Sequence, residues 1–484
     1  MLVSIDGDGP LFQRVYEGLR RAILAGDLAS GTRLPSTRAL AADLGVSRTT
    51  VLGAYDQLLA EGYVRGRVGS GTYVSSELPD QTIPNAGRVR PVRGGAGPAR
   101  LSEYASRIGS FEIVPRVPAR PVRYDFRYGT PAIENFPHDV WRRMIARRGR
   151  TASLRSLRYG PPQGLELLRE AIAGYLTRSR AVRCTANEVV IVNGSQQALD
   201  LATRLVIDPG DRVLIEEPHY QGARKVFAAA GAELVPVRVD AEGLDTSDID
   251  ETARGARLAY VTPSHQFPAG GTLSLARRLT LIAWAEANDA YIIEDDYDSE
   301  FRYEGRPVES MQGLDHAGRV IYTGTFSKVL FPALRIGYVV LPAPLVGPFT
   351  SAKWLSDRHT PTLEQEALAD FIGEGHFERH LRRSRTTNAA LRATLLGALE
   401  RRLGDRVSVR GANAGIHLVA WLNGIAPERV DRVIDAARDA GVGVYSVAPY
   451  FLGTPTAAGL LMGYPHLSDR DITAGVDILG DVLG

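Results

Sequence analysis

Lysine is rare in this chain, and one lysine stands where covalent chemistry is expected. Among 57 basic residues there are three lysines: Lys225, Lys328 and Lys353. Lys328 follows two hydroxyl residues, Thr325 and Ser327, and Arg335 comes seven residues later. A lysine amine can attack an aldehyde, while hydroxyls and a guanidinium bond phosphate oxygens. The spacing therefore predicts a Schiff base between Lys328 and an aldehyde that carries a phosphate.

A run of carboxylates forms a second candidate group. The apolar residues before it predict a buried strand that ends in Glu294, Asp295 and Asp296, and α/β sheets place ligand sites at the carboxyl ends of their strands. A carboxylate at this strand end can keep an aromatic ring nitrogen protonated, and Tyr297 can bond a hydroxyl on the same ring. A metal site is the alternative interpretation of the three carboxylates.

Two further segments suit a phosphorylated aromatic ring. Residues 190–199 predict a strand, a glycine turn and a helix that starts near Ser195 and Gln196, and the N–H groups at a helix N-terminus bind phosphate. Tyr220 follows another expected strand and can stack on a planar ring. Each segment alone is weak evidence for such a site. The order of the two segments along the chain, together with Asp295 and Lys328, is strong evidence for a site that binds a phosphorylated aromatic ring.

A sheet is needed to bring these residues together. Apolar, β-rich runs at 188–192, 212–216, 257–262, 291–295 and 320–322 alternate with helical patterns. This alternation predicts an α/β domain with a mostly parallel sheet. We expect the domain to span 122–484, after a first domain at 1–78 and a linker at 79–121 that is rich in Arg, Pro and Gly. We interpret the linker arginines as solubilising, with DNA contact as the alternative.

The first domain shows a helix-turn-helix pattern. Ser36 can cap one short helix, Gly45 falls in a tight turn, and a second helix begins at Arg48. We expect its buried side to carry Leu52, Tyr55 and Leu58. Residues 62–74 then predict a two-stranded wing. The polar residues expected to face DNA are Ser47 in the turn, Arg48, Thr49 and Thr50 at the start of the second helix, and Arg65 and Arg67 in the wing. A plain helical bundle is the alternative.

Composition limits the class of protein. A hydrophobic content of 44% and a charged content of 23% are typical of a globular protein. No apolar run reaches the length of a membrane-spanning helix, so we expect no membrane partner and a cytoplasmic location. Cys184 is the single cysteine, which excludes an intramolecular disulfide and fits a reducing compartment. The formal charge of +2 neither indicates nor excludes a nucleic-acid partner.

The N-terminal motifs resemble those of the GntR family of bacterial repressors. The resemblance covers nearly all of 10–75 and rests on Leu-Pro-Ser-Thr-Arg at 34–38, Ala-Glu-Gly-Tyr at 60–63 and Gly-Ser-Gly-Thr at 69–72. It implies that double-stranded operator DNA is bound through Arg38, Arg48 and the wing around Gly69.

Residues 124–484 resemble fold-type I enzymes of the aspartate aminotransferase kind, which bind pyridoxal 5′-phosphate (PLP). The motifs at 159–164, 262–270 and 294–303 narrow the resemblance to the MocR/GabR subfamily, whose members carry a GntR winged helix. The resemblance implies that Lys328 forms the internal aldimine, that Asp295 pairs with the pyridine nitrogen and that Tyr220 stacks on the ring. It also implies a small C-terminal α+β subdomain and a head-to-tail homodimer.

Several positions depart from the related enzymes. Phe267 stands where aminotransferases usually carry an asparagine that bonds the ring hydroxyl. Residues 459–464 lack the arginine that grips the substrate carboxylate, and Gly222 replaces an arginine of the GABA-responsive regulators. Arg224 and Arg358 are candidates to take over the carboxylate contact.

These departures favour sensing over catalysis. We expect a regulator that responds to PLP itself, like the regulators of pyridoxine biosynthesis in the same family, or to an amine that forms an external aldimine. Its targets would be genes of vitamin B6 or amino-acid metabolism. A catalytically active aminotransferase with an accessory DNA-binding domain is the alternative, and slow residual transamination is compatible with either interpretation.

Overall fold

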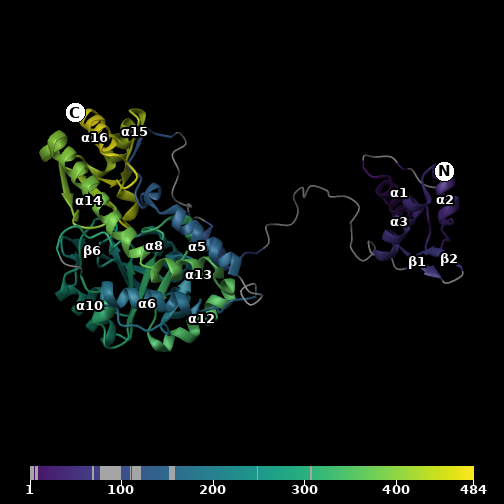
Figure 1. Cartoon of the computed structure of the whole chain (residues 1–484), viewed down its shortest axis with the longest axis horizontal. Helices are drawn as coiled ribbons and strands as arrows, with labels where there is room; N and C mark the ends of the chain where they lie inside the picture. The colour runs from purple at the N-terminus through teal and green to yellow at the C-terminus, as the bar shows by residue number, and fades with distance from the viewer. Residues whose placement is uncertain are drawn as a thin grey trace. The chain divides into compact units, whose positions relative to one another are not determined.

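The computed structural model describes residues 5, 9–67, 70–76, 100–109, 111, 121–151, 158–247, 249–305 and 308–484. Internal contacts divide the chain into two units, Met1–Arg100 and Leu101–Gly484. Figure 1 shows the two units.

The N-terminal unit is a winged helix-turn-helix. Its elements are α1 (Leu11–Ala25), α2 (Thr37–Leu44), α3 (Arg48–Ala60), β1 (Val64–Arg67) and β2 (Gly71–Val74), and the two strands pair antiparallel. Ser36 and Ser47 cap α2 and α3 by accepting from the third N–H beyond each of them. The turn between these helices uses Gly45 at φ 65°. Tyr55 and Leu58 are buried as expected, but Leu52 is 45% exposed, so its inward prediction is wrong.

The C-terminal unit is built on an eight-stranded sheet with the order β4-β11-β10-β9-β8-β5-β6-β7. The strands are β4 (Val189–Val192), β5 (Arg212–Glu217), β6 (Glu233–Asp240), β7 (Gly243–Leu244), β8 (Ala256–Val261), β9 (Tyr291–Asp296), β10 (Val320–Thr325) and β11 (Gly337–Val340). Strands β11 and β7 run antiparallel to their neighbours, and the other pairings are parallel. The five strands expected from the sequence are confirmed: their starts agree within one residue and their ends within three residues.

Helices cover both faces of this sheet. Along β4, Val190 and Val192 pack into a core shared with α7 (Ser195–Val206), α8 (Gln221–Ala230) and α12 (Ala343–Asp357), whereas Ile191 packs on the opposite side with α6 (Glu166–Arg180) and α13 (Thr362–Gly373). Side chains alternate along a strand, so two apolar faces explain the unbroken apolar runs of the sequence. Helix α13 also packs against α5 (His138–Thr151), while α9 (Ile249–Thr252), α10 (Leu275–Ala287) and α11 (Met311–Leu314) complete the layers.

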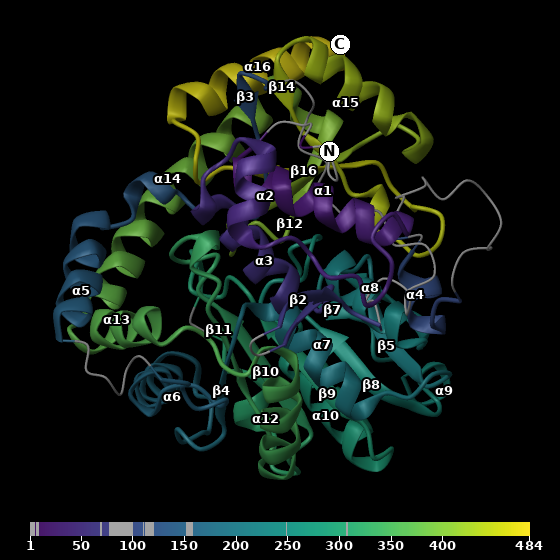
Figure 2. The same ribbon diagram turned by 90° about the vertical axis from the view of Figure 1, so that its right-hand side faces the viewer.

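A smaller α+β subdomain follows. Its antiparallel sheet has the order β12-β13-β16-β15 and comprises β12 (Val407–Arg410), β13 (His417–Leu422), β15 (Tyr445–Ser446) and β16 (Gly459–Gly463). Helices α14 (His376–Leu403), α15 (Val430–Asp439) and α16 (Asp469–Leu483) gather at one end of the unit in both views (Figures 1 and 2). The short strand β3 (Tyr124–Asp125) joins this subdomain by pairing with β14 (Val442–Gly443).

One helix lies inside the stretch expected to be a linker. Helix α4 (Glu103–Ile108) is capped by Ser102 and packs on α8, and Arg107 donates from Nε to the carbonyl oxygen of Ala229 at 2.9 Å. Most of the remaining expected linker lies outside the described residues. No helix within the described ranges is both long and apolar enough to cross a membrane.

Candidate cofactor site

A cavity of about 760 Å³ opens at the carboxyl ends of the parallel strands, against the C-terminal subdomain. Its volume lies in the usual range for a small-molecule site. Seven of the residues predicted from the sequence line it: Ser195, Gln196, Tyr220, Asp295, Tyr297, Thr325 and Lys328. The strand ends thus bring together side chains that are up to 133 residues apart in sequence.

Lys328 lies just beyond β10, in the part of the cavity next to Gly129. Its Nζ donates to the Gly129 carbonyl oxygen at 2.8 Å. Gly129 has φ 74°, and a Cβ there would come within 2.9 Å of Nζ, so glycine makes room for the amine. Burial lowers the pKa of the Lys328 amine below its usual value. A lowered pKa increases the neutral, nucleophilic fraction of the amine.

Asp295, the residue before the last one of β9, lines the cavity, and one of its two carboxylate oxygens has no partner among the described residues. Its Oδ2 accepts from the Tyr260 hydroxyl at 2.7 Å, whereas Oδ1 is buried with no partner among the described residues. Burial raises the pKa of Asp295 from 3.8 to about 7. A buried carboxylate oxygen without a partner calls for a donor from a ligand.

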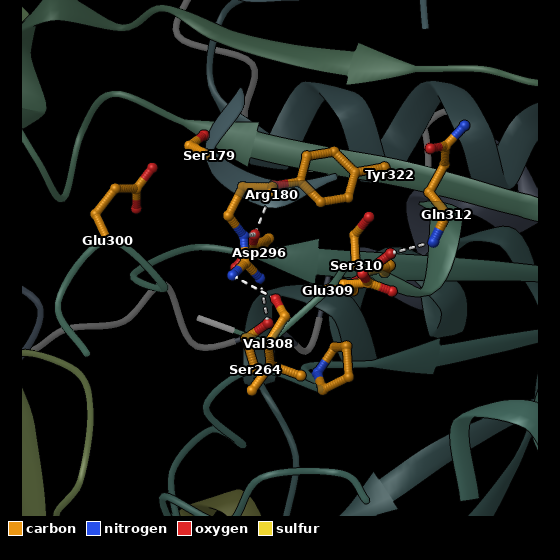
Figure 3. A network of polar contacts seen from close by, with 12 residues as sticks. Ser179, Arg180, Ser264, Asp296, Glu300, Val308, Glu309, Ser310, Gln312 and Tyr322 are labelled. Atoms are coloured by element: carbon orange, nitrogen blue, oxygen red, sulfur yellow. Dashed lines mark hydrogen bonds and ion pairs between the residues drawn. The ribbon is translucent and has the colours of Figure 1, made fainter. Parts of the chain in front are cut away.

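The two carboxylates next to Asp295, those of Glu294 and Asp296, have partners outside the cavity lining. Glu294 accepts from the N–H groups of Met311 and Gln312 at 2.9 Å each. Asp296 forms a buried ion pair with Arg180 at 2.9 Å and accepts from the Tyr322 hydroxyl, as Figure 3 shows. The three carboxylates therefore do not converge on one point, which removes the support for a shared metal site. The Arg180 pair instead anchors the end of β9 that presents Asp295.

The predicted phosphate-binding residues lie around the N-terminus of α7. The helix begins at Ser195 after Gly194, which has φ 86°, and Thr325 lines the cavity nearby. Arg335 and Ser327 are not among the lining residues. Arg335 nevertheless donates from Nη2 to the Asn193 carbonyl oxygen at 2.9 Å, and a Cβ on Gly194 would come within 2.7 Å of that nitrogen. The Ser327 hydroxyl oxygen is buried and has no partner in the described part of the chain.

The aromatic wall explains one departure from the GABA-responsive regulators. A Cβ on Gly222 would come within 2.4 Å of Cε1 of Tyr220. The Tyr220 ring therefore occupies the space that a larger residue at 222 would need, and it packs edge-on against Phe267 at 5.7 Å.

Sequence reasoning missed part of the cavity lining. The cavity is also lined by Phe111, Arg127, Tyr128, Lys225, His417, Tyr445 and Tyr450. Arg127 reaches the site because the Gly463 N–H donates to the Phe126 carbonyl oxygen at 2.8 Å, which places this segment beside β16. No local pattern signals such a contact between residues more than 300 positions apart.

The arginines suggested from the sequence do not line the cavity. Arg224 is 3.5 Å from the Phe451 carbonyl oxygen, and Arg358 stacks over Trp354 and Tyr159. Arg127 is the arginine that lines it, but its Nη2 lies 3.0 Å from Oδ2 of Asp125. A carboxylate that enters the cavity would therefore compete with Asp125.

These donors and acceptors fit PLP. Asp295 would hold the pyridine nitrogen, Lys328 the aldehyde carbon, the α7 N-terminus the phosphate, and Tyr220 one face of the ring. When bound, PLP supplies an electrophilic carbon and an electron-accepting ring.

The N-terminal unit presents the predicted DNA-binding residues to solvent. Arg38, Ser47, Arg48, Thr49, Arg65 and Arg67 are exposed, and Thr50 is half-buried. Arg48 Nε is 3.4 Å from the Thr37 hydroxyl, which bridges α3 to α2. Gly69 lies outside the described residues.

Comparison with known proteins gives the same two-part organisation. The model of the bacterial regulatory proteins of the gntR family matches residues 11–74, and the model of the class I and II aminotransferases matches residues 129–470. The chain is 41% identical over 479 residues to the "Probable rhizopine catabolism regulatory protein MocR" of Rhizobium meliloti, which covers 99% of this chain and 95% of the relative. The chain belongs to the MocR subfamily of the GntR regulators.

Other relatives agree with this assignment. The MocR-type chain is 31% identical over 453 residues to the pyridoxine biosynthesis regulator PdxR of Corynebacterium glutamicum, covering 93% of this chain and 91% of that one. Pyrococcus horikoshii kynurenine aminotransferase matches with a TM-score of 0.71 and 26% identity, over 80% of this chain and 95% of the enzyme. This MocR-type protein is a DNA-binding transcription regulator with a PLP-binding, aminotransferase-like domain.

Proposed function

We propose that this regulator changes its binding to operator DNA when PLP, or a primary amine that condenses with PLP, occupies the cavity. The observation that carries the proposal is the composition of the cavity. Its lining includes Lys328 and Asp295, and one Asp295 oxygen has no partner among the described residues. Strand β16, by contrast, carries buried Leu460 and Leu461 and no arginine. The relative PdxR supports a link to vitamin B6 genes, and amino-acid metabolism is the other candidate target.

The effector that best suits this cavity has no carboxylate. Asp125 neutralises Arg127, and its other oxygen accepts from the Tyr445 hydroxyl at 2.6 Å. To bind Arg127, an effector carboxylate would have to displace Asp125, whose two oxygens are both held by hydrogen bonds. The exchange would therefore contribute little to the free energy of effector binding. PLP itself, or an amine without a carboxylate, meets no such competition.

Helix α8 connects the cavity to α4, the first helix of the C-terminal unit. Gln221, Gly222 and Lys225 in its first two turns line the cavity, while the Ala229 carbonyl oxygen near its other end accepts from Arg107 of α4. Phe111, just beyond α4, also lines the cavity. Because a ligand shifts an equilibrium through its differential affinity for two states, a ligand that changes the packing of α8 or Phe111 would change the docking of α4.

We further propose a head-to-tail homodimer located with its DNA in the cytoplasm. A cluster of exposed apolar side chains supports self-association: Tyr159 is 80% exposed, Leu355 is 77% exposed and Trp354 is 46% exposed. Arg358 stacks between Tyr159 and Trp354, which holds the cluster together. Analytical ultracentrifugation of the full chain tests this: Leu355→Asp should produce monomers, and an unchanged dimer would place the interface elsewhere.

A mobility-shift titration on the DNA upstream of the protein's own gene tests the main proposal. The protein is compared without PLP, with PLP, and with PLP plus candidate amines. A change in affinity or complex mobility with PLP alone supports PLP sensing, and a change that needs an amine supports amine sensing. Equal binding in all conditions, combined with oxoacid formation from amino acids, would favour the active aminotransferase instead.

A further inference from the structure

A buried group of three polar side chains stands behind one wall of the cavity. Tyr297 lines the cavity, and its hydroxyl lies 3.1 Å from Nδ1 of His265. Oδ2 of Asp298 lies 3.0 Å from the same nitrogen. His265 and Asp298 are each 1% exposed. Neither residue was singled out by its sequence pattern, and neither has a role in the site described above.

The fold reserves space for this group. Gly415, at φ 82°, passes so close that a Cβ there would lie 2.0 Å from Cε1 of His265 and 2.7 Å from Oδ2 of Asp298. His417 packs on the other side, with its ring centroid 4.9 Å from that of His265, and burial holds the pKa of His417 well below its usual value. The neighbour of His265 is therefore a neutral imidazole.

The hydrogen-bond chemistry decides where the protons lie. An ionised carboxylate can only accept, so the short contact with Asp298 requires Nδ1 of His265 to carry a hydrogen. A nitrogen that carries a hydrogen cannot accept another from Tyr297. The Tyr297 oxygen therefore faces a donor, and the Tyr297 hydroxyl hydrogen points away from Nδ1 of His265.

His265 and Asp298, together with His417, also form a candidate ion site. Ligand atoms of His265, Asp298 and His417 all lie within 4.8 Å of one another. Both Asp298 oxygens, however, approach Nδ1 of His265, at 3.0 and 3.3 Å, so the carboxylate is already engaged as the partner of an imidazole N–H. The geometry favours a hydrogen-bond role.

We propose that Asp298 and His265 are positioning residues that fix the tautomer of His265 and thereby hold the Tyr297 hydroxyl hydrogen toward the ring hydroxyl oxygen of bound PLP. The role is needed in this chain because Phe267, which has no donor, packs edge-on against Tyr297 at 5.9 Å where an aminotransferase would present an amide. The proposal depends on PLP binding but not on the response of DNA binding to PLP.

The expected effect is a shift in the pH titration of the cofactor's visible absorption. A donor to the ring oxygen favours its ionised form, so loss of the donor raises the apparent pKa of the bound cofactor. A hydrogen bond to a charged group corresponds to a shift of about one to two pH units. Tyr297→Phe should show this shift in the full-length, PLP-loaded protein.

Asp298→Asn separates the proposal from a simple charge effect. Asp298 acts on Lys328 as a negative charge that raises the lysine pKa, so removal of that charge alone would lower the apparent pKa of the cofactor. If Asp298 acts through His265 and Tyr297, Asp298→Asn should instead raise the apparent pKa, and it should add no further rise in the Tyr297→Phe background. A lowered pKa, or an equal shift in both backgrounds, overturns the proposal.

A second pair of variants tests the proposal even if Asp298→Asn does not fold. His265→Asn can retain an amide N–H near the place of Nδ1, and it should titrate like the wild type, whereas His265→Leu should titrate like Tyr297→Phe. Identical titrations for the two variants overturn the proposal. If the wild type shows no visible PLP absorption band that Lys328→Ala abolishes, PLP binding itself is contradicted. The failure of the positioning role and the failure of PLP binding are therefore distinguishable.

Discussion

The Tyr260 hydroxyl donates a 2.7 Å hydrogen bond to Oδ2 of Asp295, and both side chains are buried at the base of the cavity. The bond fixes one carboxylate oxygen and leaves Oδ1, which has no partner among the described residues, available to a ligand. Asp295 is thus oriented before any cofactor arrives, which lowers the entropic cost of binding.

Asp295→Asn should weaken PLP binding. The variant keeps the shape of the side chain but loses the charge that would pair with a protonated pyridine nitrogen. Loss of a hydrogen bond to a charged group costs about 1.5–3 kcal/mol, or roughly 10- to 150-fold in Kd. Fluorescence titration of the apoprotein with PLP measures the change. Tyr260→Phe should have a smaller effect in the same direction, and unchanged affinity in Asp295→Asn would remove Asp295 from the site.

The stability of the apoprotein should depend on pH through the same residue. Burial raises the pKa of Asp295 from 3.8 to about 7. Its neutral form therefore stabilises the fold fully below about pH 4, and this contribution is lost as the pH rises through about 7. Thermal unfolding of PLP-free protein between pH 5 and pH 8 should show a larger loss of stability for the wild type than for Asp295→Asn. Parallel curves would contradict the raised pKa.

The sequence could predict the strands and the residues at their ends because both depend on local patterns. Apolar runs mark the buried strands, and Asp295 lies in the last two residues of β9 while Lys328 lies three residues beyond β10. Arg127 could not be predicted, because its segment reaches the cavity through the pairing of β3 with β14. His417 could not be predicted, because it reaches the cavity through β13, which pairs with β16 in the C-terminal subdomain. Leu52 was misplaced because Val51 and Tyr55 already supply the inward positions of that turn of α3.

Lys328→Ala should abolish the visible absorption of bound PLP without loss of the fold. The Lys328 amine donates to the Gly129 carbonyl oxygen in the cavity, while Lys353 is paired with Asp357 at 2.7 Å within α12. Absorption spectroscopy with far-UV circular dichroism as the folding check measures both properties. Lys353→Ala serves as the control and should retain the band. A band that survives in Lys328→Ala would assign the covalent link to Lys225, which also lines the cavity.

Arg48→Ala should weaken specific DNA binding. Arg48 is exposed at the first position of α3, where a helix-turn-helix meets the major groove. Loss of a base contact costs about 1–3 kcal/mol and relaxes specificity at one position, whereas loss of a phosphate contact weakens all sequences alike. Mobility-shift assays on the upstream DNA and on random DNA distinguish these outcomes. Arg21→Ala, an exposed arginine of α1, is the control, and equal losses in both variants would indicate a general charge effect.

Arg107→Ala should uncouple the cavity from DNA binding. The Arg107 side chain ties α4 to the Ala229 carbonyl oxygen of α8, whose opposite end lines the cavity. Without that bond, a change in the position of α8 should alter the position of α4 less. Allosteric coupling typically amounts to about 1–3 kcal/mol, so the DNA affinities measured with and without PLP should converge by roughly 5-fold or more while PLP binding itself stays unchanged. Arg204→Ala, which removes an exposed arginine of α7, should leave the response to PLP intact. A response that persists in Arg107→Ala would exclude α4 as the connection and would point to Phe111 as the next residue to replace.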